Sequence, residues 1–471
     1  MPSDDGDVLS SALALAAAYR AGTTDPVVAV DALLERTAAL SDEVGAFVTV
    51  TADQARASAI AARDALRGPG ADALPLLFGV PTAIKDLTPT AGVRTTFGSA
   101  AFADVVPEDD GTVALLVASA GMISLGKTNA PELGLPCYTE PDVAPPARTP
   151  YDLTRGAGGS SGGAAAAVAS GLVPVALGSD GGGSVRIPAS VCGLVGIKPT
   201  RGLVPEMPSE IDVSGLVVPG TLANTVADAA ALLDLLALTG SRMLGASRRA
   251  PGRLRVGRFH APVISDVPPH PEVVAAYEDT SRLLERLGHD VVEVDPPFGP
   301  ETVAAFETAW FVGAASAAVP LEREELLRPL TRWERERGRA ASGVEYADAL
   351  LALRQAEQRT LAAYEDYDVV LTPTIGQLPA PIGSLRDDSD PSADFEAQKA
   401  FTPYTSIWNV AGCPALSLPT GWSAAGLPIG TMIAGRPGHD ALLLSLAAQV
   451  EDALSTPGNR WSRPRTLVRP R

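Results

Sequence analysis

The sequence predicts a layered α/β protein, and its pattern and composition both support this. Apolar strand-like segments alternate with amphipathic helical segments at 254–319, in the order strand, helix, strand, helix, which is typical of α/β layers. Further apolar segments follow at 367–383 and at 409–435, the second as two strands joined by a turn. With 46% hydrophobic and 20% charged residues, the composition is that of a globular protein rather than a disordered one.

We expect a single domain over residues 1–471. The length is about three times that of a typical domain, but large α/β enzymes often form one unit. Three predicted helices begin near Leu9, Pro26 and Thr51. The expected parts are an N-terminal helical layer at 1–66, a core with the main motifs at 67–240, a more variable α/β and helical segment at 241–366, and strands and a helix that complete the core at 367–471.

Charge and composition exclude several classes of partner. A formal net charge of −18 has the wrong sign for binding a phosphate backbone, so we expect no nucleic acid. The N-terminus is acidic where a secretory signal needs basic residues, and no apolar run reaches the roughly 18 residues of a membrane span. Cys137, Cys192 and Cys413 are too few and too scattered for a disulfide framework or a zinc site. We therefore expect a cytoplasmic protein without a metal.

The most unusual stretch covers residues 156–187 and reads GAGGSSGGAAAAVASGLVPVALGSDGGGSVRI. It holds two glycine-flanked serine sites, Ser160 with Ser161 and then Ser184. Glycine tolerates positive φ and costs backbone entropy, so two such clusters indicate tight turns where the main chain approaches another group closely. A structural interpretation is also open, in which a serine of the first cluster caps the helix that follows it.

A nucleophilic serine needs a base. The histidines, His260, His270, His289 and His439, all lie outside the glycine-rich stretch and lack motif-like neighbours. A lysine can act instead when burial keeps it neutral; from a usual pKa near 10.4 this needs a shift of roughly 3 units, or about 4 kcal/mol. Lys85, inside the apolar stretch PLLFGVPTAIKDL, is the better placed candidate. We expect Lys198, in GIKPT, to snorkel or to pair structurally.

Residues 121–128, GMISLGKT, match the phosphate-binding pattern GxxxxGK[ST] and raise the alternative of a nucleotide-binding protein. The mechanism behind that pattern needs a strand before the first glycine and a flexible loop between the glycines. Here a helix is predicted before Gly121, and the residues between the glycines are mostly apolar and strand-like. A strand followed by a turn is therefore favoured, without a nucleotide at Lys127.

Several motifs together resemble the amidase signature family. In chain order they are GVPTAIKDL, GKTN, GGSSGGAAAAVASGLVPVALGSDGGGSVRIPASVCGLVGIKPT, LTPT, and NVAGCPALSLPTGW with GLPIG. The longest is too extended for a chance match, and the resemblance is weakest between about 240 and 365. It implies an amidase domain with a large central mixed β-sheet covered on both faces by helices, and an amidohydrolase that needs no cofactor.

The resemblance also implies a Ser, cis-Ser, Lys triad. Ser184 matches the nucleophile, Ser160 the relay serine that follows a cis peptide bond, and Lys85 the base. Independently of the family, a neutral lysine that takes a proton from one serine can make a second serine nucleophilic through it. The consecutive glycines would leave backbone N–H groups free to bind the oxyanion.

Neighbours of the predicted nucleophile have supporting roles. We expect the oxyanion donors to be Gly181, Gly182 and Gly183, together with the amide of Ser184 itself. Asp180 and Arg186 match positions that we interpret as an ion pair around the loop, and Ser161 is expected to support the turn and cap the helix. Two positions depart from the family: Gly181 stands where threonine or isoleucine is common, and Asn224 where arginine is frequent. The first departure leaves extra room beside the substrate.

The substrate is expected to be a small-molecule amide or carbamate, or an ester. The stretches TEPD and SVRIPASVCG resemble amidases of the nylon-oligomer and cyclic-amide hydrolase type, and urethane cleavage would use the same steps. The glutaminase A-type subunit of tRNA-dependent amidotransferases is an alternative. Cys137, Tyr138 and Trp408 are the expected pocket residues, with core packing as the other interpretation. We expect a monomer or homodimer.

Overall fold

The computed structural model describes residues 8–455, so the two ends of the predicted domain lie outside the described residues. Within this range the largest element is an eight-stranded sheet of order β4-β6-β5-β10-β11-β9-β7-β8. Pairing is antiparallel from β4 to β9 and parallel from β9 through β7 to β8, so the sheet is mixed, as predicted. In chain order the strands are β4 (Val175–Asp180), β5 (Val195–Lys198), β6 (Val218–Ala223), β7 (Arg255–Arg258), β8 (Asp290–Glu293), β9 (Val369–Pro373), β10 (Ala415–Trp422) and β11 (Pro428–Gly435).

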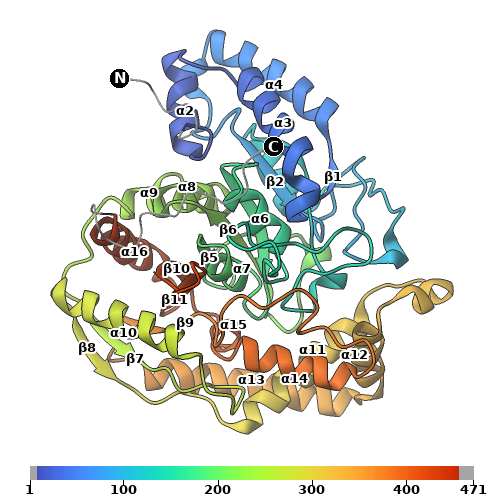
Figure 1. Ribbon diagram of the computed structural model, residues 1–471, viewed down its shortest axis with the longest axis vertical. Coiled ribbons are helices and arrows are strands. Elements are labelled where there is room, and N and C mark those ends of the chain that lie inside the picture. Colours follow the sequence, from blue (N-terminus) through green and yellow to red (C-terminus); the bar gives the residue numbers. More distant parts are fainter. Residues whose placement is uncertain (1–7, 456–471) are drawn as a thin grey trace.

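Helices cover both faces of this sheet, because apolar residues alternate along its strands. Val175 and Leu177 of β4 face one apolar cluster, which includes α8 (Val226–Ala237) and α16 (Asp440–Leu454). Ala176, between them, faces a second cluster that includes α6 (Gly162–Ala169) and α7 (Arg186–Val191). Figure 1 shows α8 and α16 on one side of the sheet and α6 and α7 on the other. The predicted α/β fold is therefore confirmed.

The N-terminal part of the described chain contains three helices and a small three-stranded sheet. The helices are α2 (Ala12–Ala21), α3 (Pro26–Val44) and α4 (Ala52–Arg67), which begin close to the three predicted starts. Ser11 and Asp25 cap the first two, each accepting hydrogen bonds from backbone N–H groups of the first turn. The described strands here are β1 (Phe47–Val50), β2 (Pro81–Lys85) and β3 (Ile123–Thr128), in the order β1-β3-β2.

The phosphate-loop interpretation of residues 121–128 is wrong. The segment contains β3, in which Lys127 and Thr128 pair with both β1 and β2 and Gly126 pairs with β1. The backbone is therefore a strand where a nucleotide site needs a loop. Lys127 is fully buried and donates to the Thr90 and Thr95 hydroxyls at 3.0 Å, and also to the Thr88 carbonyl.

Helices between β8 and β10 lie together beside the main sheet (Figure 1). The longest of them are α11 (Pro300–Ser316), α12 (Pro329–Ala340), α13 (Gly343–Ala363) and α14 (Pro391–Phe401), and α11 packs against both α12 and α13. The remaining helices are α5 (Thr112–Ser119), α9 (Arg242–Ala246), α10 (Pro271–Arg286) and α15 (Ser406–Val410). No helix in residues 8–455 has the length and apolar character of a membrane span.

Candidate active site

Lys85 ends β2 and is almost completely buried, with 1% of its surface exposed. Its Nζ lies 2.8 Å from Ser160 Oγ, 3.1 Å from Ser179 Oγ and 3.2 Å from the Ser179 carbonyl oxygen. An ammonium has three N–H donors, whereas a neutral amine has two and one lone pair. Ser179 can therefore accept both N–H groups of a neutral Lys85, which leaves the lone pair for the hydroxyl hydrogen of Ser160.

The surroundings favour that neutral form. Burial lowers the pKa of Lys85 to about 7, while the negative charge of Asp180 acts in the opposite direction. A charged amine loses solvation in an apolar interior, so burial disfavours its protonated form. A substantial fraction of Lys85 is thus able to accept a proton near neutral pH.

Ser160 follows a cis peptide bond from Gly159, the geometry that the family resemblance implied. It is 2% exposed and precedes α6, where close packing is possible because Gly163 has no side chain: a Cβ there would lie 2.3 Å from the backbone N of Asn129. This packing brings the start of α6 against the small sheet that carries Lys85. Two segments that are distant in sequence are thereby joined at one hydrogen bond.

Ser161 supports the turn, but it does not cap the helix as expected. It occupies the N-cap position of α6, yet its side chain accepts no hydrogen bond from the first turn. Its hydroxyl instead donates to the Ser179 carbonyl at 3.4 Å, and its N–H donates to the Ser184 carbonyl at 3.0 Å. Ser161 therefore connects the two glycine-rich clusters.

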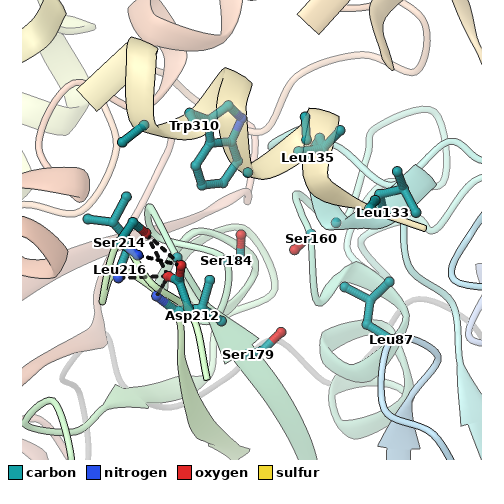
Figure 2. Close-up of a pocket in the computed structure, with 17 residues that line it drawn as sticks. Leu87, Leu133, Leu135, Ser160, Ser179, Ser184, Asp212, Ser214, Leu216 and Trp310 are labelled. Atoms are coloured by element: carbon teal, nitrogen blue, oxygen red, sulfur yellow. Dashed lines mark hydrogen bonds between the residues drawn. The ribbon is translucent and has the colours of Figure 1, made fainter. Parts of the chain in front are cut away.

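Ser184 lies in the turn between β4 and α7, and 6% of its surface is exposed. It lines the same cavity as Ser160 and Ser179, of about 300 Å³. Figure 2 shows the Ser184 and Ser160 hydroxyls at the centre of this cavity, with Trp310 across from them. The cavity gives both serines access to a small molecule.

Asp180 and Arg186 form the predicted ion pair beneath this turn, and both side chains are fully buried. The guanidinium contacts both carboxylate oxygens, at 2.8 and 2.9 Å, and also reaches Asn409 Oδ1 at 2.7 Å. Burial opposes ionisation of Asp180, but the charge and hydrogen bonds of Arg186, with Lys198 and Asn409, outweigh it and hold the pKa of Asp180 well below its usual range. The pair fixes both ends of the turn that carries Ser184.

The prediction that the Gly183 N–H binds the oxyanion is wrong. The Gly183 N–H donates to Asp180 Oδ1 at 2.8 Å, so it is occupied. Gly183 has φ of +129°, and a Cβ there would lie 2.4 Å from Thr405 Oγ1, so the glycine serves the turn rather than the oxyanion. In residues 8–455, no hydrogen bond occupies the N–H groups of Gly181, Gly182 or Ser184. These three are the available donors.

The cavity wall is mostly apolar. Asp212 is the only acidic residue in the described lining, and its carboxylate is used within its own loop by the N–H groups of Ser214, Leu216 and Val217 and by the Ser214 hydroxyl. Figure 2 shows these bonds on one side of the cavity. Apolar side chains on the wall are Leu87, Leu133, Leu135, Leu216, Val217 and Trp310. The site therefore suits an uncharged group.

A second, smaller cavity of about 80 Å³ also borders Ser184. Cys137 lines it, as expected of a pocket residue, together with Gly182, Ile187, Phe306 and others. The thiol of Cys137 is buried, and burial together with Asp394 raises its pKa far above its usual range. Cys137 therefore contributes a neutral wall rather than a reactive group.

The prediction that Tyr138 and Trp408 line the substrate pocket is wrong. Tyr138 is 3% exposed, and its hydroxyl donates to Asp394 at 2.6 Å instead of lining either cavity at Ser184. Trp408 is 2% exposed and packs with Tyr364, Tyr404 and Ile407 in a separate core cluster. Core packing, the other interpretation, applies to both.

Other candidate bases lie away from the two cavities. In the described part of the chain no histidine lines either cavity, and His289, for example, bonds to the Leu254 N–H and to Gln449. Lys198 does not snorkel: it ends β5, is 1% exposed and donates to the Pro199 carbonyl at 2.9 Å. Lys85 is thus the lysine that contacts a serine of the site.

Sequence reasoning missed Ser179 and Trp310. Ser179 directly precedes the Asp-Gly-Gly-Gly-Ser motif but sits in a strand, so its contact with Lys85 depends on how the two sheets meet. Trp310 lies in the predicted helix at 301–319, and its spacing of four residues from Phe306 places both aromatic rings on one helix face. That spacing is the sequence feature that could have indicated an aromatic wall.

Comparison with known proteins identifies the family. The profile of the family described as Amidase matches residues 28–444. The chain belongs to the amidase family. A protein of Mycobacterium tuberculosis named "Putative amidase AmiB2" is 39% identical over 429 residues, which cover 89% of this chain and 91% of that protein.

Solved structures of amidases share the fold. That of 6-aminohexanoate cyclic dimer hydrolase is 31% identical with a TM-score of 0.89, covering 98% of this chain and 100% of that chain. A glutamyl-tRNA(Gln) amidotransferase subunit from Thermotoga maritima is 29% identical with a TM-score of 0.74, covering 93% and 94%. As a member of the family, this amidase is an amidohydrolase that acts on C–N bonds.

Proposed function

We propose that the protein hydrolyses uncharged amides through an acyl-enzyme on Ser184, with Ser160 as proton relay and Lys85 as base. The observation that carries this proposal is the 2.8 Å hydrogen bond between Lys85 Nζ and Ser160 Oγ, at a lysine whose pKa burial lowers to about 7. A lysine kept neutral near pH 7 matches the requirement for a general base.

The proposed reaction has two halves. Lys85 takes the proton of Ser160 while Ser160 takes that of Ser184, and the Ser184 oxygen bonds to the carbonyl carbon. The tetrahedral intermediate collapses as the C–N bond breaks, and Ser160 returns a proton to the leaving nitrogen. A water molecule then attacks the acyl-enzyme by the same proton path and releases the carboxylic acid and free Ser184.

The negative oxygen of the intermediate needs donors already in place. We assign this role to the unoccupied N–H groups of Gly181, Gly182 and Ser184. Fixed N–H dipoles directed at the developing charge lower the barrier by several kcal/mol in related chemistry. Asp180 and Arg186 act indirectly, because their ion pair holds the turn that presents these amides.

Carbamates and esters would follow the same steps, so urethane cleavage belongs to the proposed range. The alternative of a glutamine amidotransferase A-type subunit fits the cavity less well. Glutamine carries both an ammonium and a carboxylate. The one acidic or basic side chain in the described lining of the larger cavity is Asp212, whose oxygens already accept hydrogen bonds within its own loop. A buried charge without a partner is costly.

A hydrolysis panel tests the proposal. Purified enzyme is assayed on anilides, linear amides, carbamates, esters and glutamine. Ser184→Ala is assayed beside a control, Ser384→Ala, at an exposed serine that lines neither cavity. We expect turnover of uncharged amides, with loss of at least about 1000-fold in Ser184→Ala and none in the control. Turnover retained by Ser184→Ala would exclude Ser184 as nucleophile.

A further inference from the structure

The two cavities meet at Ser184 but differ in their access to Ser160. Ser184, Leu135 and Trp310 line both cavities, whereas Ser160 and Ser179 line only the larger one. Gly181 lines the larger cavity and Gly182 the smaller. The oxyanion donors therefore lie at the boundary, and the proton relay lies on one side of it.

This asymmetry orients an amide. In the proposed reaction Ser160 protonates the leaving nitrogen, so that nitrogen must come within hydrogen-bond reach of Ser160. The carbonyl oxygen points to the N–H groups at the boundary, and the acyl substituent is directed away from the nitrogen because the carbonyl carbon is planar. The substituent on nitrogen then extends into the larger cavity, and the acyl substituent extends into the smaller one.

We propose that this amidase prefers N-substituted amides with a short, uncharged acyl group and a bulky apolar amine group, sorted into the 80 Å³ and 300 Å³ cavities by Trp310 as the partition. This inference rests on the proposed function. The smaller cavity has room for a few heavy atoms, since a water molecule occupies about 30 Å³ of liquid. The larger one accommodates an aromatic ring with further substituents.

Trp310 is held in place from three directions. Its ring stacks on Phe306 with centroids 5.5 Å apart and planes 17° apart, and a Cβ on Gly181 would lie 3.4 Å from it. On the third side the indole of Trp310 lies against the buried carboxyl group of Glu334. A tryptophan fixed in this way is a rigid wall rather than a mobile side chain.

Glu334 is suited to position the indole of Trp310 rather than to contact a substrate. It is 1% exposed on α12, and burial together with Asp394 raises its pKa well above its usual range. A protonated carboxyl still offers an acceptor oxygen to the indole N–H. Because Glu334 touches Trp310 and lines neither cavity, it is a positioning residue.

The smaller cavity favours a neutral acyl group. Ile187, Ile264, Phe306 and Phe395 line it. Lys399 also borders it, but its ammonium bonds to Glu307 at 2.8 Å and to Glu396 at 2.6 Å. Lys399, the one lysine in the described lining of this cavity, is thus already paired with two carboxylates. A carboxylate at the end of the acyl chain would find no unpaired cation there.

A substrate matrix with two cavity-filling variants tests this orientation. Gly313 lines the larger cavity on α11, and a Cβ there has no neighbour within 4 Å, so Gly313→Leu is the variant chosen to narrow this cavity. Ile264→Phe fills the smaller cavity from a loop position. The substrates combine acetyl, butyryl and hexanoyl groups with methylamine, aniline and naphthylamine, and kcat/KM is measured for each pair.

We expect Gly313→Leu to lower kcat/KM at least tenfold for naphthylamides and to leave methylamides within twofold. Ile264→Phe should lower it at least tenfold for hexanoyl substrates at every amine and leave acetyl substrates within twofold. The reverse pattern, with Gly313→Leu sensitive to acyl length, would overturn the orientation. Equal sensitivity of both variants to both groups would overturn the partition.

Fluorophosphonate labelling separates failure of this inference from failure of the proposed function. Both variants should label at Ser184 at the wild-type rate, because the probe's small phosphonyl group reacts with the nucleophile directly. Normal labelling with the reverse substrate pattern overturns only the orientation. Absence of Ser184 labelling in active wild-type enzyme would overturn the proposed function as well.

Discussion

Ser179 presents two oxygen atoms to the Lys85 amine, its hydroxyl at 3.1 Å and its carbonyl at 3.2 Å. Removing the hydroxyl in Ser179→Ala leaves one N–H of Lys85 without its partner and frees the amine to turn from Ser160. A hydrogen bond of this kind contributes about 1.4 kcal/mol, a factor of ten. We expect kcat to fall about tenfold with little change in KM, measured by steady-state kinetics. An unchanged kcat would show that Ser179 does not orient the base.

The pKa of Lys85 predicts how activity depends on pH. Because burial lowers this pKa to about 7, Lys85 is protonated below that pH and cannot accept a proton. We expect kcat/KM to fall as the pH drops through about 7 and to level off above it.

A second buried lysine provides the control for this pH dependence. The pKa of Lys198 is also lowered to about 7 by burial, followed by the charge of Arg186, but Lys198 does not contact Ser160. Lys198→Met should therefore keep the acidic limb, whereas Lys85→Met should lack activity. Loss of the limb in Lys198→Met would show that the limb belongs to Lys198 rather than to Lys85.

At the scale of elements, the turn between β4 and α7 depends on the buried pair of Asp180 and Arg186. Arg186→Met leaves the Asp180 carboxylate buried without its cation, which costs about 3–5 kcal/mol of unfolding free energy. Arg282→Met is the matched control, because its pair with Asp279 is more than half exposed and should contribute less than about 1 kcal/mol. Urea unfolding measures both, and equal losses would contradict a structural role for the buried pair.

Because Lys127 lies buried in the strand β3, we expect that the protein does not bind nucleotides. Lys127 is fully buried, and its ammonium donates to Thr88, Thr90 and Thr95, so it is not accessible to a phosphate. Thermal unfolding with and without Mg-ATP should give the same midpoint. A rise that disappears in Lys127→Ala would restore the nucleotide-binding hypothesis.

The sequence could predict the residues that lie in motifs. It was less able to predict the residues whose roles depend on contacts between distant segments. Lys85, Ser160 and Ser184 lie in motifs that resemble those of the family, and the resemblance implies their roles. The three glycines before Ser184 look alike in sequence, however, and only the loop geometry shows that Asp180 occupies the Gly183 amide. Trp310 lies in the part where the family resemblance is weakest, and its place across the cavity from Ser184 depends on how α11 packs against α12 and α13.

For the whole molecule, the fold brings the parts of the site together from separate layers. The small sheet supplies Lys85, the start of α6 supplies Ser160, the main sheet supplies Ser179 and the turn with Ser184, and α11 supplies the wall. Lys85, Ser160 and Ser184, the residues of the proposed triad, all come from this one chain. The sequence could predict the α/β class from strand and helix alternation, but not that two sheets would share one site.

This completeness predicts an enzyme that works alone. We expect the purified chain, as a monomer or homodimer, to hydrolyse amides without a partner protein or tRNA, and its specific activity to stay constant on dilution. Light scattering after size exclusion, run beside the assay, measures both. Activity that appears only with a second protein would favour the amidotransferase alternative.

The most direct test of the central claim is to identify the residue that becomes covalently modified. Enzyme treated with a fluorophosphonate, or quenched during turnover of a slow ester, is digested and mapped by mass spectrometry. We expect one adduct, on Ser184, formed more slowly in Lys85→Met and Ser160→Ala. An adduct on another residue in active enzyme, or full activity after Ser184 is blocked, would contradict the proposed mechanism.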